Sequence, residues 1–327
     1  MTDAASRHQP VMLERCVDLL APALDHDGAL VVDGTLGMGG HTEGILERCP
    51  QARVVGIDRD PQAIALASAR LARFGDRFMA HHAEYDDIAG AVAAAGATHA
   101  DGVLLDLGVS SLQIDEADRG FSYAQDAPLD MRMNPEDPVS AADLLRDADQ
   151  RELARILKVY GEERYAARIA ESIVKRRETA PLTRSAELVD LVRACIPAAS
   201  RTPGSNPAKR TFQALRIAVN RELEVLEDAL PAAIESVRVG GRVVIESYHS
   251  LEDKLVKAAF AAGIESTAPP GLPIVPEEHQ PYLRALTRGA EKASAAEAEA
   301  NPRSKPVRLR AVERIRITPP SRLRRPA

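Results

Sequence analysis

Short apolar runs alternate with amphipathic stretches over the first third of the chain. Apolar runs typical of strands buried on both faces lie at residues 29–33, 52–57, 77–80 and 101–106. Helical spacing of apolar positions is found at residues 10–22, 42–48 and 61–74. Strands that alternate with helices in this way predict a parallel sheet with right-handed crossovers, and therefore an α/β fold.

The alternation stops near residue 110, and no strand pattern is found from there to residue 207. Helical spacing instead predicts helices at residues 141–160, 162–178 and 185–196. A turn rich in Pro, Gly and Ser at residues 203–207 ends this block. We therefore predict an inserted all-helical domain at 116–207, within a first domain that joins 1–115 to 208–327.

The α/β pattern returns after the insertion. Apolar positions from Phe212 to Leu230 predict one long helix, which Gly240 and Gly241 follow. Ser250 and Asp253 have the spacing of a capping box. The remaining expectations are a strand at 242–247, a helix at 251–262, irregular chain at 267–281, a mobile loop at 291–300 and a last strand at 307–317 with outward arginines.

The composition is that of a globular protein, with 45% hydrophobic, 28% charged and 3% aromatic residues and no Trp. Three scattered Cys residues cannot form a disulfide framework or a Cys-rich metal site, which favours a reducing, cytoplasmic location. No apolar run is long enough to span a membrane. We predict no metal ion, and the oligomeric state, monomer or homodimer, stays open.

The net charge is −6, but acidic and basic residues are concentrated in different segments of the chain. Residues 1–150 carry −15 and residues 220–300 carry −6, whereas residues 151–219 carry +7 and residues 301–327 carry +8. An acidic body with two basic segments is able to bind a polyanion locally. A basic face that is only solvated is an equal alternative at this point.

Three predicted parallel strands end on a carboxylate, at Asp33, Asp58 and Asp106. Ligands of such sheets bind at the carboxyl ends of the strands, and a carboxylate after the second strand is able to accept hydrogen bonds from ribose hydroxyls. The turn after Asp33 contains Gly37, Gly39 and Gly40, but Thr42 stands where a dinucleotide fingerprint needs its third glycine. Asp33 would repel a pyrophosphate, so the pattern favours a cationic nucleoside such as S-adenosylmethionine.

Together these motifs resemble the bacterial 16S ribosomal RNA cytosine-N4 methyltransferase family. The signatures are residues 33–41 (DGTLGMGGH), 56–63 (GIDRDPQA), 104–113 (LLDLGVSSLQ), 119–122 (RGFS), 128–133 (PLDMRM), 160–164 (YGEER), 210–216 (RTFQALR) and 247–253 (SYHSLED). The resemblance runs through most of the chain in order. It implies a Rossmann-like methyltransferase sheet that uses S-adenosylmethionine to methylate N4 of a cytosine in the P-site region of 16S rRNA. It also implies that the substrate is the assembled small ribosomal subunit.

The resemblance further implies the residues that bind the cofactor. They are Gly39, Gly40, His41, Asp58, Tyr85, Asp106 and Gln113. We add Asp33 and Gly37 from the turn itself. Tyr85 is expected to stack on the adenine, since related sequences have an aromatic residue there.

Three side chains are candidates for the chemistry. A cytosine amine is a poor nucleophile, so hydrogen-bond acceptors must face it while it is held in line with the methyl group. We expect Asp106 and Asp130 to be such acceptors, and His249 to accept a proton. The alternatives are that Asp106 only orients the cofactor, that Asp130 pairs with Arg132 and that His249 has a capping role.

The inserted helices are expected to hold the RNA while the target base is swung out of its stack. The side chains expected at phosphates are Arg164, Arg168, Lys175, Arg176, Arg177, Lys209 and Arg210. Those expected along a cleft are Gln213, Arg216 and Asn220. Two other classes of function stay open: a methyltransferase of another RNA or a small-molecule amine, and a non-catalytic RNA-binding assembly factor.

Overall fold

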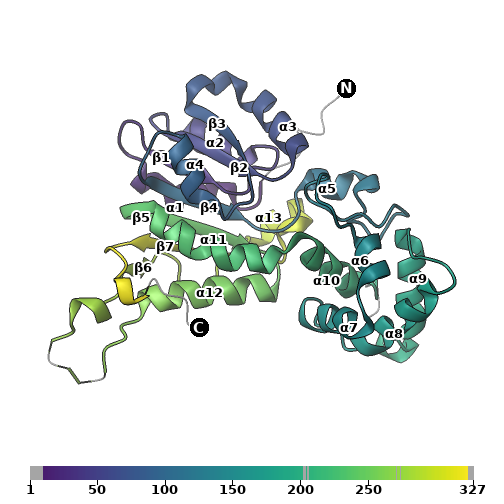
Figure 1. Ribbon diagram of the computed structural model, residues 1–327. Coiled ribbons are helices and arrows are strands. Elements are labelled where there is room, and N and C mark those ends of the chain that lie inside the picture. The colour runs from purple at the N-terminus through teal and green to yellow at the C-terminus, as the bar shows by residue number, and fades with distance from the viewer. Residues whose placement is uncertain (1–9, 202–203, 205, 270, 273, 323–327) are drawn as a thin grey trace. The chain divides into compact units, whose positions relative to one another are not determined.

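The chain forms two compact units in the computed structural model, which describes residues 10–201, 204, 206–269, 271–272 and 274–322. The first unit joins Met1–Gly108 to Glu224–Ala327, and the second is Val109–Leu223 (Figure 1). The boundaries that we expected from sequence, at 115/116 and 207/208, enclose a shorter insertion. Among the described residues, no helix has the length and apolar character needed to cross a membrane.

A seven-stranded sheet forms the centre of the first unit, in the order β3-β2-β1-β4-β5-β7-β6. Its strands are β1 (Leu30–Asp33), β2 (Arg53–Asp58), β3 (Phe78–His82), β4 (Ala100–Asp106), β5 (Val237–Ser247), β6 (Leu283–Ala285) and β7 (Arg308–Arg314). The first five strands are parallel, whereas β7 is antiparallel to both β5 and β6. The order reverses between β1 and β4, which is where such sheets bind their ligands.

Helices cover both faces of this sheet, as Figure 1 shows. They are α1 (Leu13–Leu20), α2 (Gly40–Arg48), α3 (Pro61–Leu71), α4 (Ile88–Ala94), α11 (Glu222–Ser236), α12 (Ser250–Ile264) and α13 (Ala295–Ala300). One core packs Ile88, Leu230 and Phe260 against the sheet. The other packs Leu20 and Ile45 against the opposite face. The expected α/β fold is confirmed.

The second unit is built from helices around its own core. They are α5 (Ser111–Asp115), α6 (Ala141–Asp147), α7 (Gln150–Val159), α8 (Ala166–Arg177), α9 (Ser185–Cys195) and α10 (Lys209–Asn220). The core includes the fully buried Leu145, Leu153, Ile169 and Leu188. Its described residues contain no strand beyond one isolated bridge between Pro128 and Arg184.

Two predicted helices are each interrupted in the structure. The helix expected at 141–160 is α6 and α7, because Ala148 is extended and the side chain of Asp149 caps α7 by accepting from the Glu152 N–H at 2.8 Å. The helix expected from Phe212 to Leu230 breaks at Arg221, whose φ is 52°. The apolar spacing continues across this break, but α10 and α11 pack into different cores.

The C-terminal third also departs from the sequence pattern. Strand β5 begins at Val237 and runs through the glycine pair, with an irregular register there, and β6 was not predicted. The expected mobile loop is wrong at residues 295–300, which form α13, where Ser294 caps the helix and Glu297 accepts from the Met12 N–H. Arginines are not all outward on β7: Arg314 is buried and paired with Glu235, because β7 is an interior strand.

Candidate active site

The carboxylate of Asp33 is used by the turn that follows β1. It is buried, and its two oxygens accept hydrogen bonds from the Thr42 hydroxyl at 2.7 Å and the Thr35 N–H at 3.2 Å. Burial raises the pKa of Asp33, while His41 and these hydrogen bonds act against it. Asp33 therefore fixes the turn to the start of α2, and its direct contact with a ligand stays a prediction.

Packing within the chain explains two glycines of this turn. Gly39 has a φ of +78°, which disfavours any side chain, and a Cβ there would lie 2.9 Å from Leu71. A Cβ on Gly40 would lie 2.5 Å from Pro10. The glycines thus bring the α2 N-terminus close to its neighbours, and whether they also contact a cofactor stays a prediction.

Asp58 links the glycine turn to the end of β2. Its Oδ2 accepts from the Gly37 N–H at 2.8 Å and its Oδ1 from the Asp60 N–H at 2.9 Å. Burial raises the pKa of Asp58 to about 6 in spite of these two hydrogen bonds. Each oxygen keeps a second lone pair, so the carboxylate is still able to accept from the two hydroxyls of a ribose.

Asp106 ends β4 and is held from two sides. Its backbone N–H donates to the Thr35 hydroxyl at 2.6 Å, and the Tyr248 hydroxyl donates to its Oδ1 at 2.7 Å. Burial raises the pKa of Asp106, whereas His41 and the Tyr248 hydrogen bond lower it. Tyr248 lies in the signature at 247–253 but was not predicted as a site residue, because its contact with Asp106 depends on the pairing of β4 with β5.

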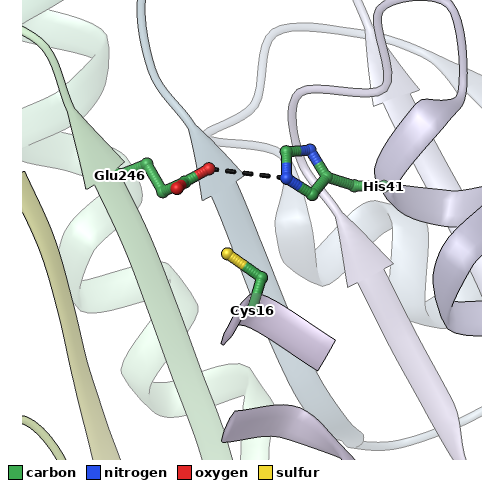
Figure 2. Close-up of side chains that lie close together, drawn as sticks. All are labelled: Cys16, His41 and Glu246. Carbon is green, nitrogen blue, oxygen red and sulfur yellow. Dashed lines mark ion pairs between the residues drawn. The ribbon is translucent and has the colours of Figure 1, made fainter. Parts of the chain in front are cut away.

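His41 lies between two carboxyl groups, beside Cys16 and Glu246 (Figure 2). Its Nε2 is 3.0 Å from the carbonyl oxygen of Val11 and 3.5 Å from Glu246 Oε2, and its Nδ1 is 3.7 Å from Asp106 Oδ2. A carbonyl only accepts, so Nε2 carries a proton and does not offer a lone pair to a metal ion. The expected absence of a metal stays a prediction.

Cys16 and Glu246 were not identified from the sequence. The Glu246 side chain is fully buried beside the Cys16 thiol, and no Lys or Arg of the described residues pairs with it. Burial first, and then the nearby Asp106, raise the pKa of Glu246 well above its ordinary value. Burial likewise raises the pKa of the Cys16 thiol. The Cys16 thiol is therefore neutral near pH 7, and burial disfavours the charged form of Glu246.

Tyr85 and His249 complete the candidates in the first unit. Tyr85 follows β3, and its Cβ lies 3.5 Å from the position of a Cβ on Gly34 in the turn after β1. His249, not Ser250 as the capping pattern predicted, is the N-cap of α12: its Nδ1 accepts from the Glu252 N–H at 3.4 Å. Its Nε2 lies 3.0 Å from Glu252 Oε1, so the capping alternative describes the observed contacts.

Gln113 and Asp130 belong to the second unit, where each has a structural partner. Gln113 Oε1 accepts from the Ser110 N–H at 3.0 Å in the capping box of α5. Asp130 accepts from Arg132 Nε at 2.9 Å and Nη2 at 2.6 Å. Burial acts to raise the pKa of Asp130, but the hydrogen bonds and charge of Arg132 hold it below its ordinary value. Asp130 is thus a poor proton acceptor, as the pairing alternative anticipated.

The predicted RNA-binding side chains divide into exposed and occupied groups. The exposed ones are Arg164, Arg168, Lys175, Lys209 and Arg210, of which Arg210 also donates through Nη1 to the carbonyl of Glu162 at 2.6 Å. Arg216 is paired with Glu222 at 2.8 and 2.9 Å, and Arg177 donates to the carbonyls of Leu145 and Ala148.

The other predicted residues of this set also bond within the second unit. Arg176 donates to the carbonyl of Ala180 and Gln213 to that of Tyr160. Asn220 donates to the carbonyl of Met131. Arg176, Gln213 and Asn220 therefore stabilise the helical unit itself.

Comparison with known proteins gives the chain its family. Three proteins named ribosomal RNA small subunit methyltransferase H are similar to it: 64% identical in Beutenbergia cavernae, 58% in Kocuria rhizophila and 57% in Streptomyces avermitilis. These alignments cover 99%, 96% and 95% of this chain and 98%, 96% and 98% of those proteins. The predictions of an S-adenosylmethionine-dependent methyltransferase and of its family are confirmed. Residues 5–315 match the model of the MraW methylase family, and the chain belongs to that family.

Proposed function

We propose that this protein transfers a methyl group from S-adenosylmethionine to N4 of a cytosine in the decoding region of 16S rRNA. The names of its relatives support an rRNA substrate in the small ribosomal subunit. The carboxyl groups of the site support S-adenosylmethionine as the methyl donor. Carboxyl groups of Asp33, Asp58 and Asp106 lie at the ends of neighbouring strands, which suits a positively charged methyl donor.

The residues proposed to hold the donor are Gly37, Gly39, Gly40, His41, Asp58, Tyr85, Asp106 and Gln113, with Asp33 behind the turn. Asp58 fits a ribose, because both of its oxygens keep an acceptor position. Tyr85 supplies an aromatic face for the adenine. When bound, S-adenosylmethionine supplies a methyl group on a sulfonium, which leaves readily and needs no metal ion.

The protein must then orient the amine and receive its proton. Replacement of one N–H by N–CH₃ releases one proton from the base nitrogen. Asp106 is proposed as the acceptor that faces the amine, because its carboxyl is only partly buried and its pKa is raised above the ordinary value. Asp130 is proposed to position its loop through Arg132, and His249 to receive a proton only if it leaves Glu252.

The second unit is proposed to bind the RNA. The exposed side chains of Arg164, Arg168 and Lys175 on and before α8, and of Lys209 and Arg210 at the start of α10, are available for phosphates. Location in the cytoplasm follows from a ribosomal substrate, and the three Cys residues are free and buried, as a reducing compartment permits.

Mass mapping of modified nucleosides tests this function. Small subunits from cells that lack the protein are expected to lose one N4-methylated cytosine, and the purified protein with S-adenosylmethionine is expected to restore it. Asp106→Asn is expected to slow restoration at least about a hundredfold, because an acceptor in the transition state is lost. An unchanged nucleoside pattern in the deleted strain would refute the rRNA substrate.

A further inference from the structure

The hydroxyl of Tyr248 makes a short hydrogen bond to a group of the proposed site. Tyr248 Oη donates to Asp106 Oδ1 at 2.7 Å. The ring packs against the core cluster that contains Leu104 and Val244. Gly108, whose φ is +102°, lies next to the ring: a Cβ there would be 3.8 Å from Tyr248 Cδ2, an ordinary packing distance.

Asp106 needs such a donor, because most of the ionisable groups around it are acids. Asp33 on β1, Glu246 on β5, Glu252 on α12 and the thiol of Cys16 on α1 are near enough to interact with it electrostatically, and His41 Nδ1 on α2 lies 3.7 Å from its Oδ2. No Lys or Arg among the described residues forms an ion pair with Asp106. Burial and Glu252 both disfavour its charged form.

We propose that Tyr248 is a positioning residue for methyl transfer. Its hydroxyl holds the Asp106 carboxyl group in one orientation toward the methyl donor and favours the charged form of this group. The hydroxyl itself stays protonated, since burial raises the pKa of Tyr248 far above neutrality. It is therefore a permanent donor to Asp106 Oδ1, while Oδ2 faces His41. This inference rests on the proposed function, because it takes Asp106 as a group that contacts the donor or the base.

The test is a double-mutant cycle on the binding of S-adenosylmethionine, measured by calorimetry from pH 6 to pH 8.5. Tyr248→Phe keeps the ring and removes only the hydroxyl. The affinity of this variant for S-adenosylmethionine is expected to be within about threefold of the wild type at pH 8.5 and about tenfold weaker at pH 6. The difference arises because the lost hydrogen bond favours the charged form of Asp106, which is harder to maintain at the lower pH. In the Asp106→Asn background the same substitution is expected to change affinity less than about twofold at every pH.

The controls separate the possible causes. Tyr282→Phe removes the hydroxyl of another buried tyrosine of the same unit and is expected to leave binding unchanged. An equal effect of Tyr248→Phe in the wild type and in Asp106→Asn would mean that the hydroxyl acts through packing. No effect of Tyr248→Phe at any pH would mean that the hydroxyl has no role in binding. Either result overturns the inference. If Asp106→Asn itself binds the donor normally, Asp106 does not hold the donor, and the role of Tyr248 toward the donor fails with it. Methyl transfer to rRNA is tested separately by the nucleoside mapping, so the two failures can be told apart.

Discussion

Asp58 shows how the fold prepares a carboxylate for two different partners. Its oxygens already accept the N–H groups of Gly37 and Asp60, yet burial keeps its pKa at about 6. The charged form is thus only moderately favoured before the donor binds. Ribose hydroxyls that donate to the carboxylate would favour the charged form and lower the pKa in the complex.

Binding of the methyl donor should therefore depend on pH through Asp58. If the pKa falls from about 6 to an ordinary value of about 4, affinity should decrease about tenfold between pH 7 and pH 5. The sign follows because protonated Asp58 must lose its proton on binding. Calorimetry at pH 5.5 in buffers of different ionisation enthalpy should show proton release. Asp58→Asn should bind weakly and release no proton by this route; the same proton release in that variant would assign it to another group.

Some residues of the site could be predicted from the sequence and others could not. Asp33, Asp58 and Asp106 were found because each ends an apolar run, and local order along the chain was enough. Tyr248, Cys16 and Glu246 were missed because their relevance depends on which strands and helices become neighbours. The resemblance supplied His41, but it did not show that the Nε2 of this side chain donates to the Val11 carbonyl.

Helices and strands were predicted well where one run of regularly spaced apolar residues packs into a single core. The first four strands and α1 to α3 were predicted within a few residues, because each had a buried face and a clear stop. The errors lie where continuity of the pattern was misleading. Apolar spacing runs unbroken through Arg221, and no spacing rule shows that the two halves serve separate cores. Strand β6, with three residues, is too short to have a detectable period.

The loop at residues 128–133 is an element that Asn220 at the end of α10 fixes in the second unit. Asn220 is fully buried; it donates to the Met131 carbonyl and accepts from the Met133 N–H, both at 2.7 Å. Met131 has a φ of 61°, an unfavourable conformation that these bonds help to maintain. Asn220→Ala leaves two buried backbone groups without these partners.

We expect Asn220→Ala to lower the free energy of unfolding of this unit by about 2 to 4 kcal/mol. Urea denaturation of the full chain, followed by hydrogen exchange at residues 128–133, measures the effect. Gln213→Ala on the same helix removes a single hydrogen bond to the Tyr160 carbonyl and should cost about 1 kcal/mol. Equal costs for the two variants would show that the loop does not depend on Asn220.

At the scale of the molecule, charge is arranged by segment and not by unit. Residues 109–223 contain 18 basic and 18 acidic side chains, so the second unit carries no net charge. Within this unit, the excess of basic residues lies at 151–219, which includes α8, α9 and nearly all of α10. Attraction for RNA must then come from a local surface with exposed side chains such as Arg168 and Lys175.

Binding of small ribosomal subunits should weaken as salt increases. Each phosphate contact contributes about −0.7 to −0.9 to the slope of log affinity against log salt, so Arg168→Ala with Lys175→Ala should reduce the magnitude of the slope by about 1.4 to 1.8. Filter binding at several potassium chloride concentrations measures this slope. Lys254→Ala and Lys257→Ala, which remove exposed charges on α12, should leave it unchanged. A slope that is flat in the wild type would contradict RNA binding by the basic segment.

The position of β7 has a consequence for how the protein is made. This strand lies between β5 and β6, and residues 308–314 are synthesised after the whole helical insertion. Because β6 pairs with β7 alone among the described strands, and both cores of the first unit include residues of β7, neither the sheet nor these cores can be completed before β7 has been synthesised. The core of the helical insertion, by contrast, ends at Leu215, with Ala218 and Val219 packed against it. During synthesis the helical unit is thus able to fold first, while the sheet that carries the proposed site is completed later.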